Sequence, residues 1–239
     1  MIKAVIFDYD GTLSNRQKSA YSFYRDFIST YNLDLSEVEF EAMLQDLIVD
    51  DCNGTIPFDC RMKPFMLKYG KLFPNDFEEK ITKAFFDKMW SYNVLKDETI
   101  ETLEKLQGKY KLAILSNGDS IIQHNKIRHV NIEKYFDEIV VTGDIGVHKP
   151  DVRPFEYTLN KLGVKNDEAL MVGDVFATDI LGASRANIKT VWLLEDSERP
   201  NFSYKGYRIR KLNEIFDVLK KEIRWIFLLL MMMALNLLD

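Results

Sequence analysis

The sequence predicts an α/β protein with a doubly wound parallel sheet, into which a separate domain of helices is inserted after the first strand. Three observations predict this fold. Five short runs are rich in Val, Ile and Leu and show little alternation, as in strands that are buried on both faces. Helical patterns lie between most of these runs, which favours right-handed βαβ crossovers. About eighty residues after the first run contain no such strand, and this length is sufficient for a small second domain.

The five strands are expected at 3–7, 111–116, 138–143, 169–173 and 188–194. Two of the helices between them are clear in the sequence: 97–106, which is closed by Gly108, and 153–163. Together these elements place the sheet domain at residues 1–13 and 97–221.

The insertion, residues 14–96, is predicted to be all helical. Ser36 and Glu39 have the spacing of a capping box that opens one helix, and Asn75 is expected to cap another. An earlier helix is predicted by apolar residues at helical spacing, namely Ala20, Phe23, Tyr24, Phe27, Ile28 and Tyr31. We interpret the aromatic residues of the insertion as core rather than as a cofactor site, because helical spacing indicates packing.

The composition excludes several classes of function. Hydrophobic residues make up 46% and charged residues 29% of the chain, which provides for both a core and a solvated surface. The net charge of −5 argues against non-specific nucleic-acid binding, which needs a basic face. Cys52 and Cys60 do not make a disulfide framework or a zinc site, and the amino terminus lacks a secretory signal pattern. We therefore expect a cytoplasmic protein with free thiols.

Polar side chains follow four of the predicted strands. Ligands of open α/β sheets bind outside the carboxyl ends of the strands, so these side chains should converge on one edge. In strand order they are Asp8 and Asp10, Ser116 and Asn117, Lys149, and Asp174 and Asp179.

The segments that carry these residues resemble the four motifs of the haloacid dehalogenase superfamily. The segments are "DYDGT" (8–12), "SN" (116–117), "KP" (149–150) and "GDVFATD" (173–179), in this order. The insertion is similar to the family's helical cap between motifs one and two, and the resemblance extends from residue 1 to about 221. It implies a Rossmann-like core with an inserted cap.

Three carboxylates, a lysine and a small hydroxyl residue are suited to a magnesium and phosphate site. Mg²⁺ prefers oxygen ligands, which the side chains of Asp8 and Asp174 can supply. The resemblance adds the backbone carbonyl of Asp10 as a ligand, and it implies that Thr12 shapes the phosphate-binding loop beyond the strand. The phosphate itself would be bound by Ser116, the backbone around Asn117 and the ammonium of Lys149. We expect Asp179 to hold Lys149 or a metal-bound water.

The resemblance implies that Asp8 is the nucleophile and Asp10 the general acid and base. The predicted function is therefore a magnesium-dependent phosphatase that hydrolyses a small phosphorylated metabolite through an aspartyl-phosphate. A phosphomutase of the β-phosphoglucomutase kind shares these motifs and stays open. A haloacid dehalogenase is disfavoured because its family members have no acid at the position of Asp10, and a noncatalytic protein is disfavoured by the complete set of motif residues.

The carboxyl-terminal segment 222–239 contains the apolar stretch "WIFLLLMMMALNLL" (225–238). At about 1.5 Å per residue, this stretch is too short to cross a hydrocarbon layer of roughly 30 Å. Packing on the protein body, packing on another subunit and contact with a membrane surface all stay open for it.

Overall fold

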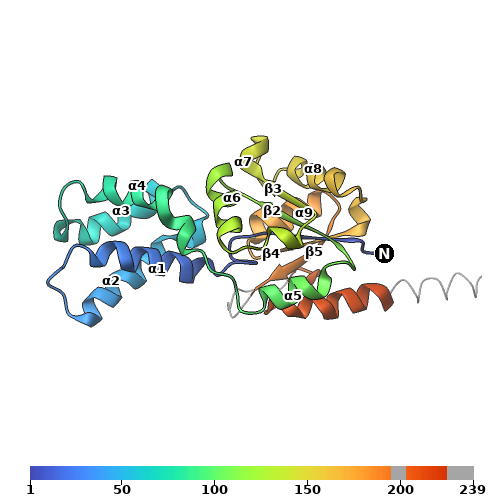
Figure 1. The fold of residues 1–239 in the computed structure, drawn as a ribbon, viewed down its shortest axis with the longest axis horizontal. Helices are drawn as coiled ribbons and strands as arrows, with labels where there is room; N and C mark the ends of the chain where they lie inside the picture. The colour runs from blue at the N-terminus through green and yellow to red at the C-terminus, as the bar shows by residue number, and fades with distance from the viewer. Residues whose placement is uncertain (195–202, 225–239) are drawn as a thin grey trace, which may run out of the picture. The chain divides into compact units, whose positions relative to one another are not determined.

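The structure is a computed structural model that describes residues 1–194 and 203–224 (Figure 1). The chain forms two compact units. The sheet unit contains Met1–Leu13, Lys96–His124 and the described residues from Asn131 onward. The helical unit contains Ser14–Leu95 and Asn125–Val130. The apolar stretch 225–238 lies outside the described residues.

The sheet unit is built on six parallel strands in the order β3-β2-β1-β4-β5-β6. The strands are β1 (Ala4–Phe7), β2 (Lys111–Ser116), β3 (Glu138–Val141), β4 (Ala169–Gly173), β5 (Lys189–Leu193) and β6 (Tyr207–Ile209). Every residue of β1 and β4 is buried, which explains why their sequences do not alternate. The α/β fold class and the five expected strands are confirmed.

Two strand predictions need correction. The strand β6 was not expected, because its three residues alternate around a central Arg208 and are too few to show a pattern. The third strand was expected to reach residue 143 but ends at Val141, where the helix α7 (Thr142–Ile145) begins.

Helices cover both faces of the sheet, as a doubly wound fold requires (Figure 1). Alternate residues of β1, Ala4 and Ile6, pack against α8 (Val152–Leu162) and α9 (Leu181–Arg185). On the other face lie α5 (Thr99–Leu106) and the helical residues 215–224. The remaining helical elements of this unit are the first half of α6 (Ser120–His129), the π-helical turn η6 (Phe176–Ile180) and the short helices η4 (Glu133–Tyr135), η5 (Asn166–Glu168) and η7 (Leu212–Glu214).

The ends of α8 illustrate how the sequence defines a helix. The side chain of Asp151 accepts a hydrogen bond from the backbone nitrogen of Arg153 and so caps the amino terminus. At the other end Gly163 adopts a φ of +63°, which glycine tolerates without strain. The ammonium of Lys111 donates to the carbonyl of Leu162 at 2.6 Å and satisfies one of the last carbonyls.

The described residues of the helical unit form helices and no strand. These are α1 (Arg16–Ser29), α2 (Glu37–Asp50), α3 (Phe58–Tyr69) and α4 (Phe77–Lys88), with the short helices η1 (Cys52–Gly54), η2 (Gly70–Leu72) and η3 (Met89–Tyr92). Both bonds of the predicted capping box between Ser36 and Glu39 are present at the start of α2. The prediction for Asn75 is wrong: α4 begins at Phe77, and its N-cap residue Asp76 makes no side-chain cap bond.

The core of the helical unit is aromatic. The rings of Phe73 and Phe77 stack with centroids 3.8 Å apart, and Phe65 packs against both. Phe23 makes edge-to-face contacts with Phe85. Such pairs stabilise beyond their buried area. Most aromatic residues of the insertion belong to this core, as expected, whereas Phe86 is 49% exposed.

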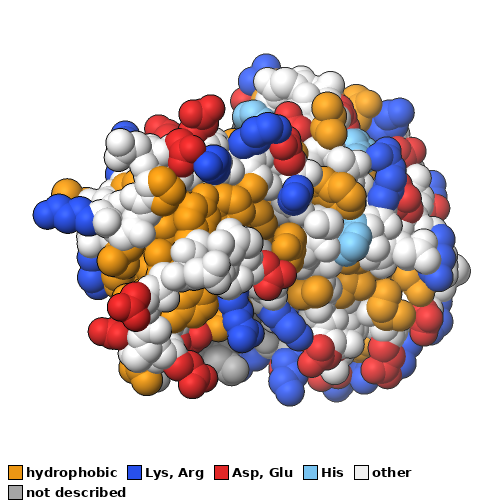
Figure 2. Space-filling model, turned by 60° about the vertical axis from the view of Figure 1, so that its left-hand side comes forward, with side chains coloured by type: hydrophobic (Ala, Val, Ile, Leu, Met, Phe, Trp, Pro, Cys, Tyr) orange, Lys and Arg blue, Asp and Glu red, His pale blue; other side chains and the backbone are white. Residues whose placement is uncertain are grey.

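The surface carries charges of both signs. Figure 2 shows Lys and Arg side chains interspersed with Asp and Glu side chains over the face that it displays, beside an area of apolar side chains. None of the described helices combines the length and the apolar composition that a membrane span requires.

A buried cluster of charges lies inside the helical unit. Asp51 accepts hydrogen bonds from Arg16 at 3.0 Å and from Arg61 at 2.8 Å, and all three side chains are buried. The phenol of Tyr24 also donates to Asp51 at 3.0 Å. Burial and the neighbouring Asp51 raise the pKa of Tyr24, so this phenol stays a donor. The negative charge of Asp51 is thus paired with the positive charges of two buried guanidinium groups.

We expect Asp51→Ala to destabilise the helical unit by about 3–5 kcal/mol, because it leaves two buried cations without their counterion. The matched control is Asp46→Ala, which breaks an exposed ion pair with Lys68 and should change little. Urea unfolding followed by circular dichroism measures both. Equal midpoints for the two variants would contradict a structural role of the buried cluster.

Candidate active site

The predicted polar residues lie at the carboxyl ends of three adjacent strands. Asp8 directly follows β1, Ser116 is the last residue of β2, and Asp174 directly follows β4. Because β1 pairs with both β2 and β4, these three side chains start from neighbouring positions on one edge.

Lys149 bridges two of the carboxylates. Its ammonium donates to Asp8 Oδ1 at 2.7 Å and to the carbonyl of Leu115 at 2.7 Å, and it pairs with Asp179 Oδ1 at 2.8 Å. Burial alone would lower the pKa of Lys149, but the carboxylates of Asp179 and Asp8 more than offset this effect and raise it. The lysine therefore carries its positive charge at the edge of the sheet. Of the two expectations for Asp179, the structure shows the contact with Lys149.

Asn117 fixes the loop that carries Lys149. Its side-chain oxygen accepts a hydrogen bond from the backbone nitrogen of Lys149 at 2.9 Å, and its amide donates to the Lys149 carbonyl at 3.1 Å. This reciprocal pair joins the loop after β2 to the loop before α8. The side chain of Asn117 thus positions the lysine, while a role in phosphate binding stays with its backbone as a prediction.

Three carboxylates crowd together beside the lysine. Oxygens of Asp8, Asp174 and Asp179 lie within 4.8 Å of one another. Burial raises the pKa of Asp8 well above its ordinary value, although Lys149 opposes the shift. Burial and the charge of Asp179 raise the pKa of Asp174 to about 7. The ionised cluster is therefore short of positive charge.

The donor set of this cluster fits Mg²⁺. All the side-chain ligands on offer are carboxylate oxygens, which hard cations prefer. A cation would offset both the burial and the repulsion that raise the two pKa values. Asp8 and Asp174 have oxygens left for a metal, whereas both oxygens of Asp179 already accept bonds, from Lys149, Thr178 and the backbone of Val175.

Two glycines make this crowding possible. Gly11 has a φ of +89°, and a Cβ atom there would lie 2.4 Å from an oxygen of Asp174. A Cβ atom at Gly173 would lie 2.4 Å from the Cβ of Asp179. Any side chain at either position would push a carboxylate out of the cluster.

Thr12 contacts the acidic cluster directly. Its hydroxyl donates to Asp174 Oδ1 at 3.0 Å, and this bond works to lower the pKa of that carboxyl. Thr12 is fully buried. The structure thus gives it a contact with a predicted metal ligand, in addition to its place in the loop after β1.

Sequence reasoning missed two residues of the site. Gln123, on α6, donates to Asp10 Oδ2 at 2.9 Å and to Ser116 Oγ at 2.6 Å. The indole nitrogen of Trp192, on β5, donates to the backbone carbonyl of Asp174 at 3.0 Å. A polar residue one turn into the helix after "SN" was the available signal for Gln123. Nothing in the sequence distinguishes Trp192 from a core residue.

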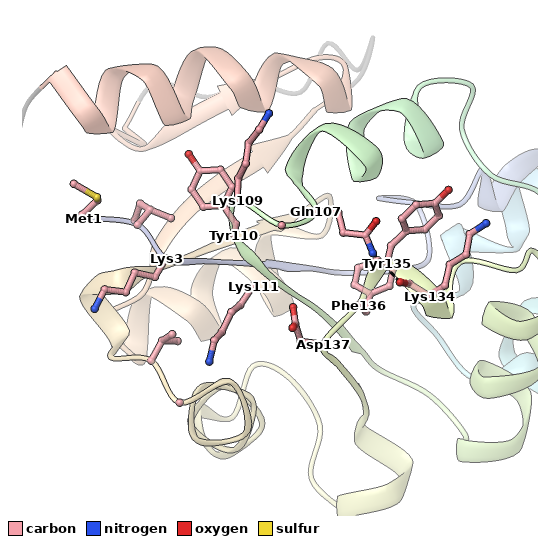
Figure 3. Close-up of a pocket in the computed structure, with 14 residues that line it drawn as sticks. Met1, Lys3, Gln107, Lys109, Tyr110, Lys111, Lys134, Tyr135, Phe136 and Asp137 are labelled. Atoms are coloured by element: carbon pink, nitrogen blue, oxygen red, sulfur yellow. Dashed lines mark hydrogen bonds between the residues drawn. The ribbon is translucent and has the colours of Figure 1, made fainter.

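A cavity of about 680 Å³ lies elsewhere in the sheet unit. It is lined by the start of β1, the turn before β2 and the segment before β3, which form the amino edge of the sheet (Figure 3). Lys3 there pairs with Glu168, and Figure 3 shows Lys109 and Lys111 pointing in opposite directions. Since ligands of such sheets bind at the carboxyl edge, we place the active site at the carboxylate cluster.

Comparison with known proteins relates this chain to a family of hydrolases. The family model described as haloacid dehalogenase-like hydrolase matches residues 5–193. A glyceraldehyde 3-phosphate phosphatase from Methanopyrus kandleri is 31% identical over 237 residues, which cover 92% of this chain and 98% of the relative. The pyrimidine 5'-nucleotidase YjjG from Escherichia coli is 26% identical over 227 residues, which cover 91% of this chain and 98% of the relative.

Solved structures share the fold. The HAD-hydrolase YfnB from Bacillus subtilis, which was solved bound to magnesium, superimposes with a TM-score of 0.72 at 24% identity. The match covers 91% of this chain and 98% of that protein.

We expect the magnesium affinity to depend on pH. With the pKa of Asp174 at about 7, the carboxyl is ionised above this pH and binds a cation without losing a proton. Below it a proton must be displaced, so the affinity should fall by up to about tenfold per pH unit. Calorimetric titration with Mg²⁺ at about pH 8 and about pH 5.5 measures this.

The control is Thr12→Val, which keeps the shape of the side chain but removes the bond that lowers the pKa of Asp174. Its loss of affinity should set in at a higher pH than in the wild type. An affinity that is equal at both pH values would contradict the assignment of Asp174 as a ligand.

Proposed function

The chain belongs to the haloacid dehalogenase-like hydrolases, and from this premise we propose that it is a magnesium-dependent phosphatase acting on a small phosphorylated metabolite. The observation that carries the proposal is the pair of acids after β1. Asp8 is buried against the ammonium of Lys149, and Asp10, two residues later, is held by Gln123. These contacts support a role for Asp8 as the nucleophile and for Asp10 as the proton carrier.

Asp8 performs the first half of the reaction. The ammonium of Lys149 donates to Oδ1 of Asp8. One oxygen of this carboxylate attacks the phosphorus atom, while the other stays available to the cation. As the bond from phosphorus to the leaving oxygen breaks, the protonated carboxyl of Asp10 gives its proton to that oxygen. Bound magnesium, held by Asp8, Asp174 and the backbone carbonyl of Asp10, would neutralise charge on the phosphate oxygens. Ser116 and Lys149 orient the phosphate.

Asp10 performs the second half. It accepts a proton from a water molecule, whose oxygen attacks the phosphorus of the aspartyl-phosphate. The bond between phosphorus and Asp8 then breaks, which releases inorganic phosphate and restores both carboxyl groups to their starting states.

The relatives favour hydrolysis of phosphate esters. The two reported above act on glyceraldehyde 3-phosphate and on pyrimidine nucleotides. Both substrates are small phosphate monoesters, which supports this substrate class for the present chain. No observation in the sheet unit favours a phosphomutase or a dehalogenase over a phosphatase.

The test is a screen of the purified protein against phosphorylated metabolites, with released phosphate as the readout. We expect phosphate release from at least one compound in magnesium, loss of activity in excess chelator and recovery when magnesium is returned. Full activity in chelator would remove the proposed mechanism. Interconversion of sugar phosphate isomers without phosphate release would identify a mutase instead.

Substitution of the two acids should separate their roles. Asp8→Asn replaces the anionic nucleophile with a neutral amide and should abolish turnover. Asp10→Asn keeps the nucleophile but loses the proton carrier, so turnover should fall about 10²–10⁴-fold.

With p-nitrophenyl phosphate, whose leaving group needs no proton, Asp10→Asn should accumulate the aspartyl-phosphate. Rapid quench and hydroxylamine treatment detect that intermediate. Equal labelling of both variants would show that the roles are assigned wrongly.

A further inference from the structure

Gln123 lies where the proton carrier and the phosphate site meet. Its side chain is buried at 2% exposure, and its amide nitrogen is within hydrogen-bond distance of three acceptors. These are Asp10 Oδ2 at 2.9 Å, Ser116 Oγ at 2.6 Å and the backbone carbonyl of Asn117 at 3.0 Å. All four residues belong to the sheet unit.

The chemistry of these partners fixes the orientation of the amide. A backbone carbonyl can only accept, so the NH₂ group of Gln123 must face Asn117 and, beside it, Asp10. The NH₂ group has two hydrogens for three acceptors, so we infer that one faces Asp10 Oδ2 and that Ser116 Oγ and the Asn117 carbonyl share the other. The hydroxyl hydrogen of Ser116 has no better acceptor among the described residues than the Asn117 carbonyl at 3.4 Å. It is therefore available to a phosphate oxygen, while the hydroxyl oxygen accepts from Gln123.

We propose that Gln123 is a positioning residue of the reaction, which holds the carboxyl of Asp10 and the hydroxyl of Ser116 in register with each other. The inference rests on the proposed phosphatase function and deepens it. The bond from Gln123 to one oxygen of Asp10 fixes the rotation of that carboxyl group.

Both proton transfers then use the carboxyl group in one orientation. In the first step its proton goes to the leaving oxygen as the bond from that oxygen to phosphorus breaks. In the second step the carboxylate takes a proton from the water whose oxygen bonds to phosphorus, as the bond to Asp8 breaks. Throughout, the bond from Gln123 keeps the carboxyl from rotating away between the two steps.

The local backbone makes room for this side chain. Gly118 has a φ of +138°, and a Cβ atom there would lie 2.9 Å from Cγ of Gln123. The side chain of Asp119 accepts from the nitrogen of Ile122 at 3.1 Å and caps the first turn of α6. The turn after β2 thus directs Gln123 back toward the strand ends rather than into solvent.

The test compares Gln123→Leu and Gln123→Glu with the wild type on p-nitrophenyl phosphate and glyceraldehyde 3-phosphate, in saturating magnesium. Leucine removes the amide, and glutamate keeps its shape but loses the donor when ionised. Only the alkyl ester needs a proton on its leaving oxygen. We therefore expect kcat/KM for this ester to fall about 10–100-fold more than for the nitrophenyl ester. The loss of support for Ser116 should raise KM for both substrates alike.

The matched control is Gln107→Leu, which removes an exposed amide bonded to the Lys134 carbonyl in the same unit. It should leave both substrates unchanged. A merely structural role of Gln123 would lower the activity on both substrates by the same factor. If the variants are active and the ratio of kcat/KM for the two substrates equals that of the wild type, the inference is overturned while the proposed function stands. A wild type that releases phosphate from neither probe, nor from any compound of the metabolite screen, overturns the proposed function and this inference with it. If Gln123→Leu does not fold, the isosteric Gln123→Glu decides, and wild-type kinetics of that variant on both substrates would exclude the donor role.

Discussion

At the carboxyl edge of the sheet, the ammonium of Lys149 lies between Asp8 and Asp179, at 2.7 and 2.8 Å. Two like charges about 4 Å apart repel by about 4 kcal/mol at an effective dielectric constant of about 20, so carboxylates this close need positive charge between them. Burial and the charge of Asp179 still raise the pKa of Asp174 to about 7. The cation that we propose for this edge would offset both effects and would attract a phosphate.

Lys149 lies between the two carboxylates because other residues hold it in place. The side chain of Asn117 forms two hydrogen bonds with the backbone of Lys149, and the Leu115 carbonyl accepts a hydrogen bond from its ammonium. The same crowding explains the glycines at 11 and 173, since a Cβ at either would displace a carboxylate. The residue type is therefore as restricted at these two glycines as at the carboxylates themselves. Both kinds of position lie within the short motifs of the sequence.

The sequence predicted what depends on neighbours along the chain. Strands buried on both faces, the capping box at Ser36 and the polar residues at strand ends all follow from local pattern and one topological rule. Gln123 was missed because its partner Asp10 is 113 residues away, and Arg61 gives no sign in the sequence that it is buried against Asp51. The prediction that Asn75 caps a helix is wrong because residue type alone does not determine cap geometry. The helix begins two residues later. Partnerships between distant polar groups are set by packing, which local pattern does not record.

Every interaction that we assign to the chemistry lies within the sheet unit, from the end of β1 to β5. In the proposed mechanism this unit requires only a phosphate ester of its substrate, because its polar groups act on the phosphorus, its oxygens and one transferred proton. Two relatives with similar coverage of this chain act on glyceraldehyde 3-phosphate and on pyrimidine nucleotides, substrates that share little else. The chemistry of such a site is therefore separable from the choice of substrate. It follows that substitutions at the carboxylate cluster or at Gln123 should change rates on all substrates in ways governed by the leaving group, whereas the identity of the preferred metabolite must be encoded outside this cluster.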